Sequence, residues 1–187
     1  MASDNARSGR TPDQRVATRF PPLWHAVGAS VLRLPPGSRV RRAFLERAAR
    51  TSFEAWVRGD YEVLRVAADP EIEVHVEMAS GADGFEVPVG LDEIYHGPDG
   101  YCESMAQWAQ SFRNWRAEVD ELIEEAPDRI LIVGRHSGEG IVSGVQVEQW
   151  GAVRYTGRHG RIVRVDAFFG PDREGVLVAS GLPGGAA

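Results

Sequence analysis

The stretch SFEAWVRGDYEVLRVAADPEIEVHV, residues 52–76, carries the pattern of two helices and a strand from which the fold is predicted. Apolar residues recur at helical spacing in its first part, and Gly59 suits the left-handed position that follows a helix end. Asp60 can then cap a second short helix, which the next Asp-Pro pair ends. Residues 71–78 alternate strictly between apolar and polar side chains, so they predict a strand with one buried face.

Further helices and strands flank this stretch. The first helix extends back to residue 38, and a third helix behind Asp99 is predicted by an apolar stripe of Tyr101, Met105, Trp108, Phe112 and Trp115. Four strand-like segments separated by turns follow, at residues 116–125, 129–139, 145–156 and 161–169. This order predicts an α+β fold in which helices cover one face of a curved antiparallel or mixed sheet, so that the whole makes a cone.

The N-terminal region differs from the rest in composition. Residues 1–20 are polar and rich in arginine, which predicts a disordered lead-in. Residues 21–37 predict an extra amphipathic helix that docks either on the domain's own surface or on a partner. We therefore expect one domain over residues 38–187, with this helix in front of it.

Charge and residue usage exclude several functions. The net charge is −6, and it is uneven: residues 1–50 hold ten arginines against three acids, whereas residues 51–187 hold eleven against twenty-four. The acidic body would repel a phosphate backbone, so we expect no nucleic-acid partner. All 21 basic residues are arginine, which excludes Schiff-base chemistry and anchoring of pyridoxal phosphate.

The cysteine count and the hydropathy pattern indicate where in the cell the protein is expected. Cys102 is the only cysteine, so no disulfide within the chain and no thiolate metal cluster can form, and a reducing cytoplasm is the simplest location. No apolar run approaches the roughly 20 residues that cross a bilayer, so we expect no membrane partner.

Four stretches carry a resemblance to a known family: residues 52–76, YHGPDGYCESMAQW at 95–108, RHSGEGIVSGVQVE at 135–148 and GRIVRVDAFFGPDREGVLVASGL at 160–182. Together they resemble the SnoaL-like branch of the nuclear-transport-factor-two-like superfamily, over about residues 43–182. The resemblance implies a cystatin-like conical barrel wrapped by three helices, with an apolar pocket and a homodimer formed through the convex sheet face. Relatives include ketosteroid isomerase, polyketide cyclases and limonene epoxide hydrolase, as well as members without catalysis.

Asp166 is the first candidate for chemistry. In such relatives a pocket carboxylate acts as a base, and burial raises its pKa towards the working pH. Strand alternation, however, places Asp166 opposite an apolar face, so it either lines the pocket as the base or pairs with a neighbouring arginine on the convex side. The acids that epoxide hydrolases and cyclases carry near this strand end fall at Ala167 and Gly170, where this chain has none.

The other site candidates are a histidine, a tyrosine and aromatic or sulfur side chains. His136 would act as an acid or polarise a substrate oxygen, or it is a structural residue. Tyr95 would donate a hydrogen bond to a ligand, or it plugs the loop before the third helix. The expected ligand-binding residues, which can equally be core, are Trp56, Met105, Trp108 and Phe112. No spacing of ligands indicates a metal, and we expect no cofactor.

These residues support two main functions. In the first, the cone holds a small apolar molecule, with any chemistry being cofactor-free isomerisation, cyclisation or epoxide opening. In the second, the module binds a ligand or forms a dimer scaffold without catalysis, with Trp108 and Phe112 filling the cavity. A third, a docking protein that uses the helix over residues 23–34, is also left open.

Overall fold

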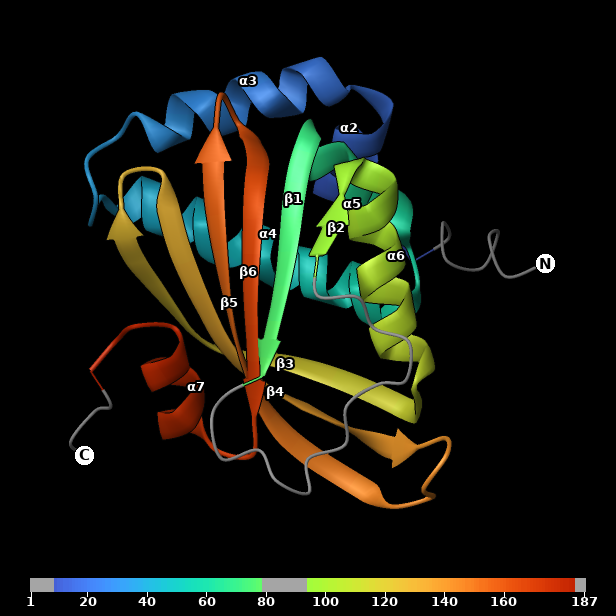
Figure 1. Cartoon of the computed structure of the whole chain (residues 1–187). Coiled ribbons are helices and arrows are strands. Elements are labelled where there is room, and N and C mark those ends of the chain that lie inside the picture. The colour runs from blue at the N-terminus through green and yellow to red at the C-terminus, as the bar shows by residue number, and fades with distance from the viewer. Residues whose placement is uncertain (1–8, 79–93, 184–187) are drawn as a thin grey trace.

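A curled six-stranded sheet forms the frame of the molecule, whose computed structural model describes residues 9–78 and 94–183 (Figure 1). The strands run in the order β2-β1-β6-β5-β4-β3, with bounds Ala68–Met78 (β1), Ile94–His96 (β2), Phe112–Ala126 (β3), Arg129–Gly140 (β4), Gln146–Arg158 (β5) and Arg161–Gly170 (β6). Among the strands of the described residues, β1 and β6 pair in parallel and the other neighbours pair antiparallel, so the sheet is mixed. This is the α+β cone that the sequence predicts.

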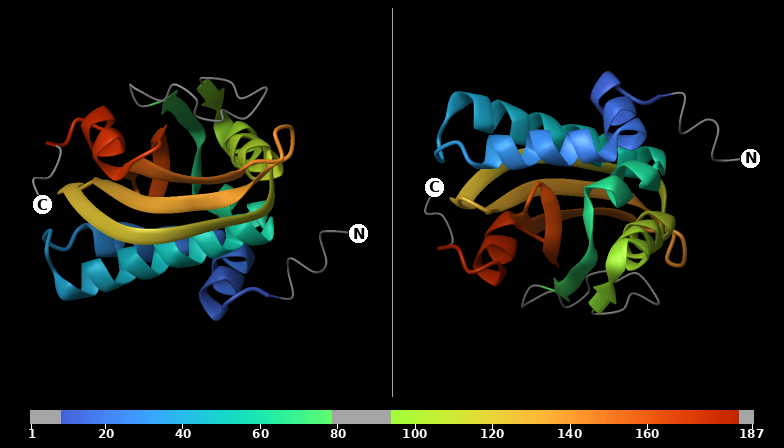
Figure 2. Two further views of the ribbon diagram at one scale, coloured as in Figure 1. Left: turned by 90° about the horizontal axis from the view of Figure 1, so that it is seen from below. Right: turned by 90° about the horizontal axis from the view of Figure 1, so that it is seen from above.

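Helices cover the two faces of the sheet unequally. The inner face packs against α4 (Arg39–Arg58), α5 (Tyr61–Ala67) and α6 (Gly97–Gln110), and this contact forms the main core. The outer face packs against α7 (Arg173–Ala179) in a smaller core of its own. In Figure 2, α3 (Pro21–Leu32) and α4 lie side by side on one side of the sheet, and α7 lies on the other.

The turn between α4 and α5 confirms one half of the capping prediction. Gly59 has φ of 75°, and its N–H donates to the carbonyls of Ala55 and Trp56, which ends α4. Asp60 precedes α5, but its side chain makes no capping bond to that helix. Its carboxylate instead accepts two hydrogen bonds from Arg10, at 2.6 and 2.7 Å.

The expectation of a disordered lead-in over residues 1–20 is wrong for its second half, because α2 spans Pro12–Arg19. Thr11 and Gln14 form a capping box at its start. The buried amide of Gln14 also donates to the carbonyl of Thr51 on α4, at 2.6 Å. Ordering here comes from specific polar contacts with the domain, which hydrophobic periodicity does not reveal. Residues 1–8 lie outside the described part of the chain.

The third predicted helix is shorter than its apolar stripe suggested. It ends at Gln110, so Phe112 and Trp115 lie on β3. The strand carries a bulge between Arg113 and Arg116, with Asn114 at φ of 53°. Both aromatic rings still contact Trp108, and for this reason the stripe resembled one helix face.

Candidate functional site

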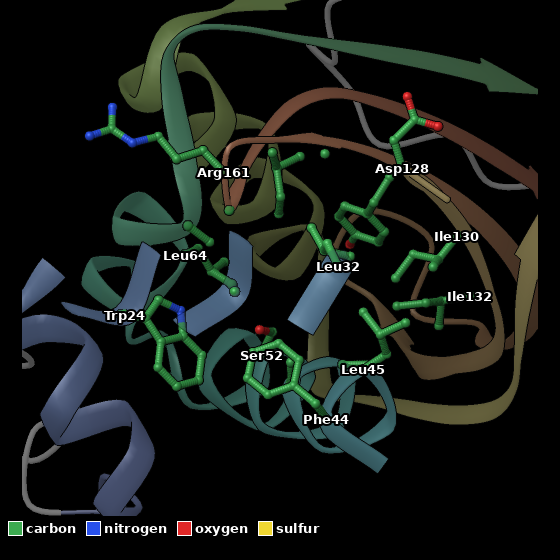
Figure 3. A pocket seen from close by; sticks show the side chains of 18 of the residues that line it. Trp24, Leu32, Phe44, Leu45, Ser52, Leu64, Asp128, Ile130, Ile132 and Arg161 are labelled. Atoms are coloured by element: carbon green, nitrogen blue, oxygen red, sulfur yellow. The ribbon is translucent and has the colours of Figure 1, made fainter. Parts of the chain in front are cut away.

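A cavity of about 160 Å³ lies between α3, α4 and one end of the sheet (Figure 3). Trp24, Gly28 and Leu32 line it from α3, and the α4 side chains that face them are mostly apolar. The sheet adds aliphatic side chains such as Ile130 and Ile132. The helix over residues 21–37 therefore docks on the domain's own surface, and there it forms one wall of the cavity.

The hairpin between β5 and β6 holds α3 in place. Gly160, in that turn, lies so close to α3 that a Cβ there would overlap the carbonyl oxygen of His25. The ring of His25 bridges two neighbours: Arg161 Nε lies 3.3 Å from Nδ1, and Nε2 lies 2.7 Å from the carbonyl of Val66. Because arginine can only donate, Nδ1 is the acceptor and Nε2 carries the proton.

A buried arginine forms hydrogen bonds with the C-terminal end of α3. Arg41 is 0% exposed, and its guanidinium donates to the carbonyls of Leu32 and Leu34 at 2.9 and 3.2 Å. It also donates to the carbonyl of Pro127 at 2.8 Å and to Glu124 Oε2 at 2.6 Å. One side chain thus joins the end of α3 to α4 and to the β3–β4 turn.

The polar groups of the cavity wall include two phenols. Tyr101 and Tyr155 both line it, and their hydroxyls share a hydrogen bond. Burial raises the pKa of both phenols, that of Tyr155 to about 12, so they are neutral at physiological pH. In Figure 3 the carboxylate of Asp128 and the guanidinium of Arg161 point away from the apolar side chains around the cavity.

Asp166 lies on the outer face of the sheet, away from this cavity. Its Oδ1 accepts from Arg164 at 2.8 Å from Nε and 2.7 Å from Nη2. Arg154 lies directly opposite on β5. Of the two alternatives for Asp166, the structure therefore shows the pairing with a neighbouring arginine, and the residue lines neither of the two cavities described here.

His136 faces the interior but belongs to an aromatic cluster. It is 1% exposed, and rings of Trp56, Trp108, Trp115 and Phe169 surround it at centroid distances of 5.0–6.1 Å. Burial lowers its pKa to about 3, so the imidazole is neutral at physiological pH. It does not line the large cavity.

The remaining predicted residues fill the interior. Tyr95 is buried on β2 and donates to Gln107 Oε1 at 2.6 Å. Trp56, Met105 and Trp108 line a second cavity of about 20 Å³, enough for roughly one water molecule. Phe112 stacks on Trp115 and lines neither cavity.

Sequence reasoning missed the wall that α3 provides and the phenols opposite it. The apolar spacing of residues 21–37 was a usable signal for the helix, but it could not say which surface the helix covers. Tyr155 shares the inner face of β5 with Val147 and Val153, so strand alternation was a usable signal for its inward position.

The described residues offer no metal site and no membrane span. Within residues 9–78 and 94–183, no three His, Cys, Asp or Glu side chains gather where they could hold a metal ion. In the same ranges no helix combines the length and the apolarity that crossing a bilayer needs.

The curled mixed sheet, the helices wrapped on its inner face and the cavity between them define a conical α+β barrel. The chain belongs to the SnoaL-like domain family, whose family model matches residues 49–165. No curated protein matches it.

Several solved structures share the fold. TerC, co-crystallised with polyporic acid, is 21% identical with a TM-score of 0.51 and covers 66% of this chain and 88% of its own. A nuclear-transport-factor-two-like protein of unknown function from Burkholderia pseudomallei is 22% identical with a TM-score of 0.53 and the same coverage of 66% and 88%. A hypothetical protein with a ketosteroid-isomerase-like fold from Catenulispora acidiphila, in complex with trimethylamine, is 14% identical with a TM-score of 0.53, covering 75% and 96%. At these identities the likeness concerns the fold alone.

Proposed function

We propose that the protein binds a small, uncharged and mostly apolar molecule in the cavity between α3, α4 and the sheet. One observation carries this proposal: a cavity of about 160 Å³ walled largely by hydrocarbon and aromatic side chains. An engineered apolar cavity of about 150 Å³ in another protein stays dry and binds benzene. A ligand of about one ring therefore matches the size and the polarity of this space.

The placement of the titratable groups favours binding without proton transfer. A base for isomerisation, cyclisation or epoxide opening must reach the ligand, and Asp166 lies on the other face of the sheet, bound to Arg164. The phenols of Tyr101 and Tyr155 stay protonated, so they supply hydrogen bonds instead of a base. These positions support the non-catalytic alternative.

Benzene tests the proposal directly. We expect saturable binding of benzene by the wild-type chain, measured by ligand-observed NMR. Ala48 lines the cavity from α4, so Ala48→Leu should fill part of the space and weaken benzene binding by at least about tenfold. Ala43→Leu, at an exposed position of the same helix, is the matched control and should bind as the wild type does.

Two results would contradict the proposal. One is a wild-type chain that shows no saturable benzene signal. The other is Ala48→Leu binding benzene as tightly as Ala43→Leu, which would place the ligand elsewhere.

The homodimer through the convex sheet face and the cytoplasmic location also belong to this proposal. Because α7 packs on the outer face over β5 and β6, a partner would have to pair with the part of that face that α7 leaves open. The molar mass of the full chain in solution measures the oligomeric state.

A further inference from the structure

The joint between α2 and α3 leaves large apolar side chains in water. Val16 and Phe20 lie one turn apart at the end of α2, Leu23 and Val27 lie one turn apart on α3, and Phe20 connects the two helices. The exposed fraction is 52% for Phe20 and 55% for Leu23, and it is 40% and 41% for the two valines. A single apolar residue on a surface is ordinary, but a set of neighbours such as this one marks an interaction site. We call these four residues the α2–α3 joint.

The side of α3 that packs on the domain is a different one. Trp24, Gly28 and Leu32 face the apolar cavity. Leu23 and Val27 each come one position earlier, which places them about 100° away around the helix. The helix is therefore apolar on two sides, and the cavity accounts for only one of them.

The joint is a preformed surface, because polar contacts hold α2 against the domain. Ala17 is buried, and the amide of Gln14 donates to the carbonyl of Thr51 at 2.6 Å. Arg47 on α4 also pairs with Asp13 at 2.9 Å. In Figure 1, α2 and α3 run along one outer edge of the molecule. The joint can therefore meet a broad surface without a rearrangement of the fold.

Basic side chains flank the joint. Arg15 and Arg19 are exposed on α2, and the guanidinium of Arg19 lies 5.9 Å from the centroid of the Phe20 ring. Arg33 is exposed directly after α3. Residues 12–34 hold these three arginines and one acid, which is already paired with an arginine of α4. The segment is thus positively charged, although the net charge of the protein is −6.

An anionic bilayer matches both the apolar and the basic side chains. Apolar residues of a helix that lies in the plane of the headgroups enter the boundary with the acyl chains, and arginines beside them meet the anionic headgroups. A nucleic acid would pair with the arginines but leave the aliphatic side chains in water, and the acidic body of the chain would repel it. A second copy joined through the same four residues would bring Arg15 and Arg19 close to their own counterparts, which is unfavourable.

We propose that the α2–α3 joint binds peripherally to a membrane surface that contains anionic lipid. Phe20 and Leu23 enter the interface, while Arg15 and Arg19 lie at the level of the headgroups. The expectation of no membrane partner came from the lack of a spanning run, and this contact needs no span. On the membrane, α3 meets the bilayer with one side and walls the apolar cavity with the other.

Vesicles of phosphatidylcholine, with and without an equal amount of phosphatidylglycerol, test the proposal on the full chain by co-sedimentation. The chain should bind the mixed vesicles, and it should bind the neutral ones at least about tenfold more weakly. Added salt should release it from the mixed vesicles, because salt screens the attraction between exposed charges. An excess of polyuridylate RNA should not release it.

A double variant measures the apolar contribution. Phe20→Gln combined with Leu23→Gln should weaken binding to the mixed vesicles by at least about tenfold, because both side chains would leave the interface. The matched control combines Val142→Gln with Val145→Gln, at exposed positions between β4 and β5, and it should bind as the wild type does. All four positions are exposed, so the Tm should change little in either variant.

A single substitution measures the contribution of charge. Arg19→Gln should weaken binding about fivefold, the effect of one basic residue near an anionic surface. Arg116→Gln, at an exposed position of β3, is its control and should bind as the wild type does. This pair also tests the joint if the double variant does not fold.

The opposite results overturn the proposal. A wild-type chain that stays in solution beside the mixed vesicles would show that no bilayer covers the joint. Equal losses in a joint variant and its control would place the contact elsewhere, and release by RNA would show that the arginines bind a nucleic acid. Benzene binding should be unchanged in all these variants, since none of the substituted residues lines the cavity, so the two proposals fail independently.

Discussion

At position 160 the backbone has φ of 77°, and the hairpin turn meets the backbone of α3. Glycine is required there for two reasons: the left-handed conformation disfavours a Cβ, and the carbonyl of His25 occupies the place that a Cβ would take. The contact brings the hairpin close enough for Arg161 to reach the His25 ring. Gly160 therefore permits the close contact between the hairpin and α3.

Gly160→Ala should displace α3 and weaken benzene binding. Gly144→Ala is the control for backbone strain alone. Gly144 has φ of 69°, and no atom lies within 4 Å of the place that its Cβ would take, so this substitution causes no steric overlap. We expect Gly144→Ala to cost about 1 kcal/mol of unfolding free energy. Gly160→Ala should cost about 2 kcal/mol more, because the methyl group meets backbone that cannot rotate away. Denaturant unfolding measures both, and equal losses would show that the close approach is unimportant.

At the scale of the elements, α3 is held by apolar packing, such as Trp24 against Phe44, and by polar attachments. Arg41 supplies the main one, since its guanidinium satisfies carbonyls that the end of α3 leaves without helical partners. The same guanidinium also donates hydrogen bonds to Glu124 and to a carbonyl of the β3–β4 turn. The position of α3 and the shape of the hairpin end are thereby coupled through one buried cation.

Arg41→Met should destabilise the fold by about 3–5 kcal/mol, because it leaves Glu124 and several carbonyls without their donor. Arg42→Met, at the next position, removes only an exposed pair with Glu46 and should change the stability little. Thermal unfolding of the two variants makes the comparison. A small effect of Arg41→Met would show that water replaces the guanidinium easily.

At the scale of the whole molecule, the interior divides into an apolar part under α3 and an aromatic part around His136. Packing the imidazole among four rings makes its protonation incompatible with the native core, and burial lowers its pKa from 6.5 to about 3. The global stability is therefore linked to pH through this one interior residue.

The unfolded chain binds a proton at His136 below pH 6.5, whereas the folded chain does so only near pH 3. This residue's contribution to stability is thus complete above pH 6.5 and is lost progressively as the pH falls towards 3. We expect His136→Phe to reduce the acid-induced loss of unfolding free energy by roughly 1.4 kcal/mol per pH unit between pH 6 and 4. Urea unfolding at several pH values measures it. His159→Asn, at an exposed turn position, should follow the wild-type slope, and an unchanged slope in His136→Phe would contradict the depressed pKa.

Local patterns in the chain were enough to establish the helix–turn–helix–strand order, the left-handed Gly59 and the α+β class, because these depend on periodicity and on backbone preferences. Alternation could also state that Asp166 shares a face away from the apolar residues of its strand. Long-range packing was needed to establish that α3 walls the large cavity, that Arg10 orders the N-terminal region, and that Trp115 turns inward from a bulge. Those outcomes depend on which surfaces meet across long stretches of chain, and a local pattern carries no information on that contact.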